Sequence, residues 1–288
     1  MLSVLLPVYN ASKYVNFSIE SILRSSFKNF ELIVINDGST DSSLSVINKY
    51  KDSRLKVFNK QNSGLIDTLN YGLQKCNFPI IMRMDADDII SSKKIENQLR
   101  YFKNNKSVLT GTTGYLIDSI GNKKGLIDLP LNHNEIIKAM LNMSASFIHP
   151  SVMYYKDAVI KVGGYDSNFK HAEDYDLFLK LSSLGKVSNL DERHIYLRKH
   201  DENISFLNAE DQINNTIISR DIYKLSKGYK YKHINYEVCK TSIHNNNLKS
   251  LFIFLHTSIV ELNNLTSTYS KIKLFIFKVL RIILKKLI

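Results

Sequence analysis

The chain has 288 residues, of which 44% are hydrophobic and 23% are charged. This excludes a largely disordered protein and allows one sizeable α/β domain with a smaller appendage. The two cysteines, Cys76 and Cys239, form no CxxC pair, so neither a disulfide framework nor a structural zinc site is supported, and a reducing compartment fits best. Lysine and arginine outnumber aspartate and glutamate by 39 to 27. The net charge of +12 leaves nucleic acid, anionic lipid and a charged substrate as partner classes to be distinguished.

Strands and helices are predicted to alternate in the first 90 residues. The N-terminal segment MLSVLLPVYN lacks the basic and long apolar parts of a signal peptide, so we expect it to form the first strand. Apolar runs predict strands at 2–8, 31–35 and 78–84, and alternation predicts a strand at 54–58. Helical spacing of apolar residues predicts helices at 12–27, 41–50 and 65–75. This order predicts a parallel sheet covered by helices on both faces.

The later segments are predicted to be shorter and more mixed. Helices are expected at 91–103, 134–143, 156–162 and 173–184, and strands within 108–129, at 147–155, and in the segments KVSNL and HIYLRKH. From about residue 208 glycine nearly vanishes and helical patterns dominate. We therefore predict a domain over residues 1–205 and a helical C-terminal region over residues 206–288.

Polar side chains follow three of the predicted strands at their carboxyl ends. These clusters are Val8-Tyr9-Asn10, Asn36-Asp37-Gly38-Ser39 and Asp85-Ala86-Asp87-Asp88. In parallel sheets, ligands bind in the crevice beyond these ends. Three strand ends directed at one crevice therefore indicate a ligand site more strongly than any single motif.

The cluster Asp85-Ala86-Asp87-Asp88 predicts a site for a divalent cation. Asp85 and Asp87 are two residues apart, so in an extended chain they face the same way with Cα atoms ~6.6 Å apart. Mn²⁺ or Mg²⁺ would remove the repulsion between them and would complete its coordination with substrate phosphates. The alternative is that Asp87 and Asp88 only cap the helix that follows.

The first two strand ends suit a nucleotide base. Asp37 lies in a segment that is a turn by composition, and its carboxylate could accept a hydrogen bond from an imide N–H of a base. Pro7 cannot donate to a strand ladder, so a rigid backbone at the end of the first strand could pack against that base.

The order of these motifs resembles the family 2 glycosyltransferases with the GT-A fold. The resemblance spans residues 1–205 and rests on three segments: LLPVYNASKYVNFSIESILRSSFKNFELIVINDGSTDSS, MRMDADDII and VGGYDSNFKHAEDYDLFLKL. It implies a single Rossmann-like nucleotide-binding sheet, mainly parallel and flanked by helices. It also implies an inverting transfer of a sugar from a nucleotide-sugar donor to an acceptor.

The resemblance also implies roles for individual residues. Those on the donor side would be Pro7, Val8 and Tyr9 lining the base pocket, Asp37 contacting uracil or an equivalent base, Arg83 near the nucleotide, Asp85 near the ribose, and Asp87 binding the metal that bridges the diphosphate. His200, in the segment HDENIS, would be a further metal ligand, and Asp174, in HAEDYD, would be the catalytic base.

One segment departs from the family pattern. The helix after Asn62-Ser63-Gly64 reads LIDTLNYG, where many members have small residues followed by Arg-Asn. Asn70 is retained and the arginine is absent. The resemblance therefore assigns no diphosphate contact to this helix.

Inverting sugar transfer requires two acidic groups with different roles, and the sequence offers both. In an inverting transfer a base takes the proton of the acceptor hydroxyl while a metal stabilises the leaving diphosphate. Asp174 is far in sequence from Asp85 and Asp87, as these different roles require. The alternative for Glu173-Asp174-Asp176 is a set of acids in the first turn of a helix. For His149 a packed or hydrogen-bonded role is favoured over an acceptor contact.

Three rival functions leave different signatures. A sugar nucleotidyltransferase should have a glycine-rich loop after the first strand, where this chain has PVYNASKY. A nucleic-acid-binding protein should spread its cations along one face, whereas here half of the net charge lies in the C-terminal tail, so no nucleic acid is expected. A non-catalytic relative that binds a nucleotide-sugar remains an alternative, although the retained acids disfavour it.

We predict a metal-dependent glycosyltransferase that uses a UDP-sugar and a glycan or lipid-linked acceptor in bacterial surface polysaccharide, capsule or lipopolysaccharide synthesis.

The C-terminal tail, KIKLFIFKVLRIILKKLI at residues 271–288, predicts a basic amphipathic helix. It holds six cations and no acid, and these interrupt it too often for a membrane-spanning helix, which needs ~20 apolar residues. We expect it to lie in the surface of an anionic membrane, which places the protein in the cytoplasm at the inner face of the cell membrane. The alternative is that the tail packs on the domain or on a second copy of the chain, and the second copy would make the protein a homo-oligomer.

Overall fold

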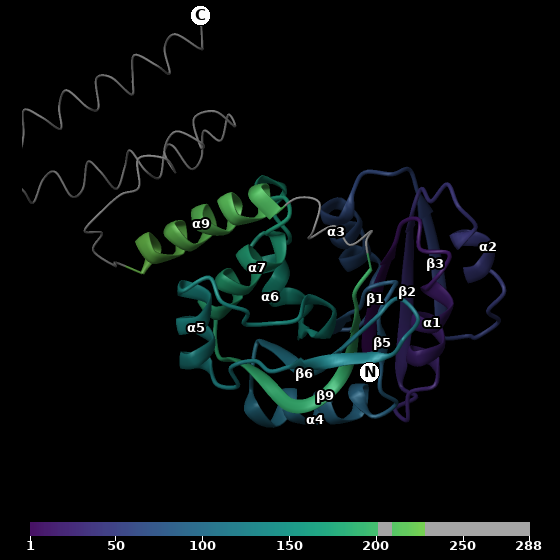
Figure 1. Ribbon diagram of the computed structural model, residues 1–288, viewed down its shortest axis with the longest axis horizontal. Helices are drawn as coiled ribbons and strands as arrows, with labels where there is room; N and C mark the ends of the chain where they lie inside the picture. The colour runs from purple at the N-terminus through teal and green to yellow at the C-terminus, as the bar shows by residue number, and fades with distance from the viewer. Residues whose placement is uncertain (201–208, 228–288) are drawn as a thin grey trace, which may run out of the picture. The chain divides into compact units, whose positions relative to one another are not determined.

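A nine-stranded sheet with flanking helices dominates the computed structural model, which describes residues 1–200 and 209–227 (Figure 1). The sheet belongs to a compact unit that ends at Gln212, and the next unit begins at Ile213. Helix α9 (Ala209–Ser226) spans this division. The predicted boundary near residue 205 and the predicted tail, residues 271–288, lie outside the described residues.

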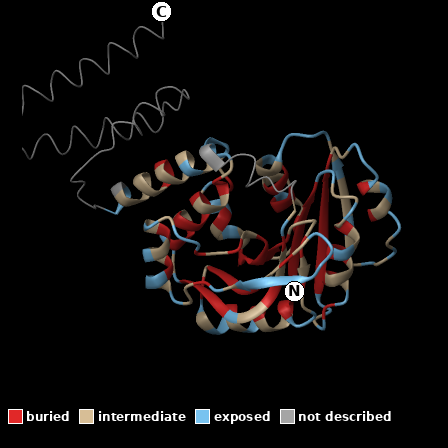
Figure 2. Cartoon of the chain, in the orientation of Figure 1, coloured by how far each residue is buried: buried red, intermediate tan, exposed pale blue. Residues whose placement is uncertain are grey.

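The first four strands form the parallel half of the sheet, in the spatial order β3-β2-β1-β4. Their bounds, with those of the helices between them, are β1 (Leu2–Val8), α1 (Val15–Leu23), β2 (Phe30–Asp37), α2 (Ser43–Ile47), β3 (Leu55–Lys60), α3 (Leu65–Lys75) and β4 (Ile80–Arg83). Every residue of β1 and β2 is buried, as Figure 2 shows. The alternation of strand and helix predicted from the sequence is confirmed, and it directs the carboxyl ends of these strands to one edge.

The second half of the sheet makes it mixed rather than mainly parallel. Beyond β4 the order is β8-β6-β9-β5, and β7 pairs with β6. Of these pairs only β6–β9 is parallel. The bounds in this half are β5 (Ile89–Ile90), α4 (Lys94–Asn105), β6 (Leu109–Ile117), β7 (Lys123–Ile127), α5 (His133–Leu141), β8 (Met153–Tyr155), α6 (Lys156–Lys161), α7 (Glu173–Ser182) and β9 (Val187–Arg198).

Three local predictions differ from the structure. The segment 147–155 is not one strand, because Pro150 lies in a 3₁₀ turn (His149–Ser151) and β8 begins only at Met153. The two predicted C-terminal strands are one twelve-residue strand, β9. Asp87 and Asp88 cap no helix, because β5 follows them directly and α4 begins only at Lys94.

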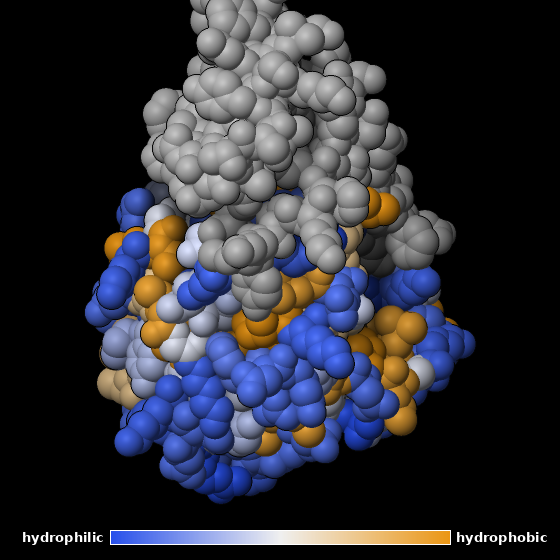
Figure 3. All heavy atoms as spheres, turned by 90° about the vertical axis from the view of Figure 1, so that its left-hand side faces the viewer, coloured by the Kyte–Doolittle hydropathy of each residue, from blue (hydrophilic) through white to orange (hydrophobic). Residues whose placement is uncertain are grey.

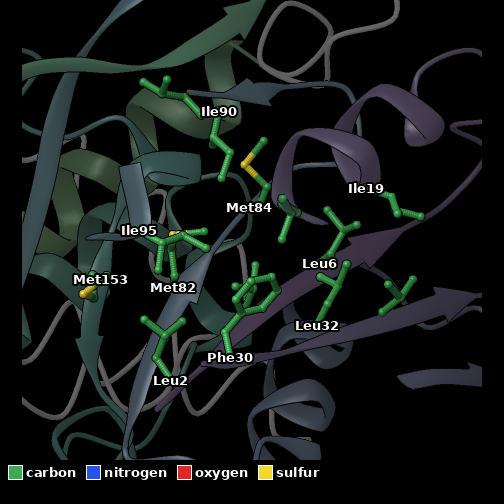
Figure 4. Close-up of a cluster of buried hydrophobic side chains, with 14 of the residues drawn as sticks. Leu2, Leu6, Ile19, Phe30, Leu32, Met82, Met84, Ile90, Ile95 and Met153 are labelled. Carbon is green, nitrogen blue, oxygen red and sulfur yellow. The ribbon is translucent and has the colours of Figure 1, made fainter. Parts of the chain in front are cut away.

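The hydrophobic core supports the acidic turn between β4 and β5. Figure 4 shows apolar side chains of β1, β2, β4, β5, α1 and α4 in one cluster. Met84 precedes the turn and Ile90 follows it, and both are buried in this cluster, with 0% and 4% exposure. Burial of apolar side chains on either side of Asp85–Asp88 therefore holds the backbone that carries these carboxylates.

One face of the described part is mainly polar. On the face shown in Figure 3, hydrophilic residues predominate and hydrophobic residues form separate patches. Within residues 1–200 and 209–227, no helix combines the length and the apolar character that crossing a bilayer requires.

Candidate functional site

Three carboxylates converge in the turn between β4 and β5. One oxygen each of Asp85, Asp87 and Asp88 can be chosen so that all three lie within 4.8 Å of one another. Asp85 and Asp87 are partly exposed, whereas Asp88 is 1% exposed. The pair predicted from the sequence is thus a cluster of three, and the structure adds Asp88 to it.

Asp88 is held by strand β9. Its Oδ1 accepts a hydrogen bond from the backbone N–H of Arg198 at 2.7 Å, and its buried Oδ2 has no hydrogen-bond partner among the described residues. Burial raises the pKa of Asp88 well above its usual value, and the charges of Asp87 and Asp85 raise it further. A carboxylate oxygen that is buried and unpaired is costly, so a cation near it would be stabilising.

Strand β9 also delivers the predicted histidine ligand. Nε2 of His200 lies 3.0 Å from Oδ2 of Asp87, and the His200 ring packs against Tyr14 with centroids 5.1 Å apart. Arg198 donates from Nε to the carbonyl of Asp87 at 2.7 Å. Sequence reasoning predicted His200 and missed Arg198, because its partners Asp88 and Asp87 lie 110 and 111 residues away and no motif names it.

This donor set fits a divalent cation. The cluster combines carboxylate oxygens of Asp85, Asp87 and Asp88 with an imidazole nitrogen of His200. Carboxylates suit Mg²⁺ and Mn²⁺, which complete their coordination with water and substrate phosphates, and a histidine beside them is compatible with a transition-metal ion. The three aspartates offer oxygens within 4.8 Å of one another, and His200 is a candidate fourth ligand because its Nε2 lies 3.0 Å from Oδ2 of Asp87.

The ends of β1 and β2 lie side by side, where the base pocket was predicted. Pro7 pairs with Ile35 and Val8 with Asn36 in the parallel register. Pro7 and Val8 are buried and contribute backbone only, whereas Tyr9 is 53% exposed. Tyr9 is therefore the member of this predicted trio whose side chain is open to a ligand.

The two loops beyond these strands are tied together by Asn10. Its Oδ1 accepts a hydrogen bond from the backbone N–H of Thr40 at 2.9 Å, and its own N–H donates to Oγ of Ser39 at 3.1 Å. Asn10 has a φ of 47°, a left-handed conformation that asparagine tolerates better than most residues. The loop after β1 is thereby fixed against the loop after β2.

Asp37 is enclosed by the loop after β3. Its Oδ1 accepts from Nζ of Lys60 at 2.6 Å and from the N–H of Ser63 at 3.0 Å, and its Oδ2 accepts from the N–H of Gly64 at 3.0 Å. The residue is 3% exposed. Most of its acceptor capacity is thus used within the protein. Sequence reasoning missed Lys60, although its place at the end of β3 was a usable signal.

Arg83 contacts the acidic turn and acts electrostatically on the predicted base. It is 2% exposed, and its Nη1 donates to Oδ2 of Asp85 at 2.5 Å. Burial raises the pKa of Asp85 and of Asp174, and the charge of Arg83 opposes the rise in both. One buried guanidinium therefore interacts with the donor side and with the predicted base.

Asp174 lies in the first turn of helix α7, where its Oδ1 accepts from the N–H of Tyr175 at 2.7 Å. Its Oδ2 lies 3.7 Å from Nδ1 of His149, and its side chain is 31% exposed. His149 is 11% exposed by side chain, and its Nε2 is 3.1 Å from the hydroxyl of Tyr165. The packed, hydrogen-bonded role expected for His149 is confirmed, and its place beside Asp174 is an addition.

Asn70, the residue retained on α3, has a structural task. Its Nδ2 donates to the carbonyl of Tyr165 at 2.8 Å, and its Oδ1 accepts from the N–H of Tyr165 at 2.9 Å. The preceding Gly164 has a φ of 76°, and a Cβ there would lie 2.7 Å from Oδ1 of Asn70. Asn70 therefore fixes the turn that carries Tyr165 into the site.

Known proteins are similar to this chain in sequence and in fold. The model of the family "Glycosyl transferase family 2" matches residues 3–164, more than half of the 288 residues. An O-antigen biosynthesis glycosyltransferase of Escherichia coli, WbnJ, is 36% identical over 184 residues, which cover 63% of this chain and 71% of WbnJ.

Two further similarities extend over more of the chain. An uncharacterized glycosyltransferase of Haemophilus influenzae is 33% identical over 282 residues, which cover 90% of this chain and 86% of that protein. The crystal structure of S. aureus TarS 1–349 in complex with UDP-GlcNAc is similar with a TM-score of 0.64 and 21% identity, over 78% of this chain and 66% of that one. At this identity the structural similarity shows the fold, which is the expected GT-A fold.

Proposed function

This chain belongs to glycosyl transferase family 2, and we propose that it transfers a sugar, with inversion, from a UDP-sugar to a hydroxyl of a glycan or lipid-linked acceptor. One observation carries the proposal: oxygens of Asp85, Asp87 and Asp88 lie within 4.8 Å of one another directly after parallel strand β4, and buried Arg83 pairs with Asp85. Such a cluster suits the metal and the diphosphate of a nucleotide-sugar. Family membership also disfavours the rival sugar nucleotidyltransferase.

Asp174 acts as the base in this proposal. Its carboxylate takes the proton of the acceptor hydroxyl as that oxygen bonds to the anomeric carbon, and the bond from this carbon to the diphosphate oxygen breaks. Asp87 and His200 would hold Mn²⁺ or Mg²⁺, which stabilises the negative charge of the leaving diphosphate when bound. Asp85, in the acidic cluster, and Arg83, which pairs with it, would orient the nucleotide.

The proposed donor and process rest on the relatives. TarS binds UDP-GlcNAc, and WbnJ is named for O-antigen biosynthesis. Asp37 and Tyr9 suit a uracil base, because one acceptor and one exposed aromatic ring lie at neighbouring strand ends. We therefore propose synthesis of a bacterial surface polysaccharide as the process.

Substitution of Asp174 tests the proposal. With UDP-sugars, Mn²⁺ and a lipid-linked or glycan acceptor, Asp174→Asn should lose transfer by roughly 10²–10⁴ and keep donor affinity within a few-fold, because a general base contributes on this scale. Asp157→Asn, an exposed aspartate on α6, is the matched control and should transfer normally. Near-normal transfer by Asp174→Asn would assign the base to another residue.

We propose separately that the basic tail docks on the inner face of the membrane, near a lipid-linked acceptor. The support is the sequence pattern of residues 271–288 alone. Truncation after Ser270 should move the protein from the membrane to the soluble fraction with donor binding intact. Binding to anionic liposomes should also weaken with added salt. If the full-length protein does not bind anionic liposomes at low salt, the tail packs on the domain or on a second copy of the chain instead.

A further inference from the structure

His149 lies between a hydroxyl and the predicted base. One ring nitrogen, Nε2, is 3.1 Å from the hydroxyl of Tyr165, and the other, Nδ1, is 3.7 Å from Oδ2 of Asp174. The ring also packs edge-on against Phe178, with centroids 5.8 Å apart at an interplanar angle of 80°. The ring is thus oriented on one face by an aromatic side chain and on one edge by a hydroxyl.

The hydroxyl that orients His149 is itself held firmly. Tyr165 is 2% exposed, and Asn70 hydrogen-bonds both its N–H and its carbonyl. The hydroxyl of Tyr154 lies 3.4 Å from that of Tyr165. Contacts from α3 and β8 therefore converge on Tyr165, in the turn after α6, and Tyr165 in turn contacts His149 on the 3₁₀ turn before β8. A side chain supported in this way is a means of fixing the residue beyond it.

We propose that His149 is a positioning residue that donates its Nδ1–H to Oδ2 of Asp174 and so holds this carboxylate in place to receive the acceptor proton. The inference rests on the proposed function, in which Asp174 is the base. The recorded separation of 3.7 Å exceeds a hydrogen bond. Hydrogen bonds in active sites are often long without substrate and tighten when it binds.

The contacts select one tautomer of His149. Burial lowers the pKa of His149 well below its usual value, and the charge of Arg83 lowers it further, so the ring is neutral and carries one N–H. If the hydroxyl of Tyr154 donates to that of Tyr165, then Tyr165 donates to Nε2 of His149, and the proton of the imidazole is on Nδ1. This tautomer presents its N–H to Asp174.

The same donation sets the pH at which Asp174 is ionised. Burial raises the pKa of Asp174, and a hydrogen bond to the ionised form acts in the opposite direction. The titratable groups that face Asp174 come from several elements: Arg83, Asp85, His149, Tyr165 and Glu173. Removing the His149 donor should therefore raise the pKa of Asp174, and the acid limb of the pH–rate profile should move to higher pH.

Three variants separate this role from a packing role. His149→Phe keeps a ring and removes the donor, His149→Asn keeps an N–H near the position of Nδ1, and Tyr165→Phe removes the hydroxyl that orients the imidazole. Tyr101→Phe is the matched control, because it removes a tyrosine hydroxyl that donates to Asn189, away from His149. Thermal melting identifies any variant that fails to fold.

We expect His149→Phe to shift the acid limb upward by about one pH unit, the scale of one hydrogen bond to a charged group. At a pH below the limb, transfer at saturating donor should fall by roughly tenfold, with the Kd for UDP within about twofold of the wild type. His149→Asn should recover part of the shift, Tyr165→Phe should show a smaller shift in the same direction, and Tyr101→Phe should show none. An unmoved acid limb in His149→Phe would overturn the proposal.

Histidine ¹⁵N NMR gives a readout that needs no transfer activity. The wild type should show His149 as the Nδ1–H tautomer, and Asp174→Asn should shift its Nδ1 signal. An Nε2–H tautomer, or a His149 Nδ1 signal that is unchanged in Asp174→Asn, would overturn the proposal. Absence of transfer by the wild type with every donor would instead refute the proposed function, and the NMR result would still decide whether His149 donates to Asp174.

Discussion

Arg198 donates from Nε to the main-chain carbonyl of Asp87 at 2.7 Å, and its own N–H donates to Oδ1 of Asp88 at the same distance. Its Nη1 reaches the carbonyls of Asp118 and Ser119, each at 3.1 Å. The end of β9 is thereby joined to the acidic turn after β4. This connection explains how His200, two residues later, comes within 3.0 Å of Asp87.

Arg198→Lys should weaken Mn²⁺ binding by about tenfold. Lysine keeps the positive charge and loses the planar set of donors that contacts three carbonyls, so the turn that carries Asp87 is less well fixed. Calorimetry with Mn²⁺ in the presence of UDP measures the change. Arg193→Lys, on the same strand and paired with Asp128, is the control and should bind Mn²⁺ normally. Equal Mn²⁺ affinity in Arg198→Lys and the wild type would limit Arg198 to packing.

Asp87→Asn should abolish the Mn²⁺-dependent part of donor binding. The amide is a weaker ligand for a hard cation than the carboxylate, and Asp87 is the aspartate that also contacts His200. Titration of UDP with and without Mn²⁺ measures the loss. Asp191→Asn, at an exposed position of β9, is the control.

His200→Ala tests whether His200 is a further ligand of the same metal ion. If His200 completes the metal coordination, this variant should need more Mn²⁺ for half-maximal donor binding and should keep the maximum. A metal titration that matches the wild type would leave His200 with a structural role, beside Tyr14 and Asp87.

Asp37 should favour uracil over guanine because of Lys60. Oδ1 of Asp37 already accepts two hydrogen bonds, from Lys60 and Ser63, whereas Oδ2 accepts one, from Gly64. One acceptor position suits the single imide N–H of uracil, and guanine presents two adjacent N–H groups. UDP should therefore bind at least about tenfold more tightly than GDP, the cost of one unpaired donor.

Lys60→Met should narrow this preference, because it frees an acceptor position on Oδ1 of Asp37. Lys56→Met, on the same strand and paired with Glu31, is the control and should keep the wild-type ratio of UDP to GDP affinity. The explanation is wrong if GDP binds the wild type as tightly as UDP does, or if Lys60→Met leaves the ratio unchanged.

Lys94 should make the folded state more stable as the pH rises from 7 to 10. Lys94 is 0% exposed, and its Nζ donates to Oε1 of Gln98 at 2.5 Å and to the carbonyl of Ser151 at 2.9 Å, with no carboxylate paired to it among the described residues. Burial lowers the pKa of Lys94 from 10.5 to about 7. Between these values the unfolded chain binds more protons than the folded chain, so the free energy of unfolding increases with pH.

Urea unfolding of the wild type and Lys94→Met across this pH range measures the effect. The wild type should gain on the order of 4 kcal/mol relative to Lys94→Met between pH 7 and pH 10, at about 1.4 kcal/mol for each unit of pKa. Below pH 7 the difference should be constant. Lys93→Met, the exposed neighbour, should show no such trend. A constant difference from pH 7 to pH 10 would mean that Lys94 stays charged in the fold.

Local patterns in the amino-acid sequence were sufficient to predict the parallel half of the sheet. The predicted segments 2–8, 31–35, 54–58 and 78–84 each coincide with a strand. Continuous apolar runs indicated the strands buried on both faces, and alternation indicated the partly exposed edge strand β3. The polar residues directly after those runs identified Asp37, Asp85 and Asp87 for the same local reason. The resemblance to family 2 glycosyltransferases added Asp174 and His200.

Only the tertiary structure decided how the second half of the sheet completes the site. Contacts between Asp88 and Arg198, between His149 and Asp174, and between Asn70 and Tyr165 join residues that lie far apart or on different elements. No periodicity encodes such pairs, because each depends on which strand edges meet after folding. The antiparallel pairing of β8 with β4 and the pairing of the long strand β9 with β6 bring the second half of the sheet to the site. Both depend on long-range pairing rather than on local propensity.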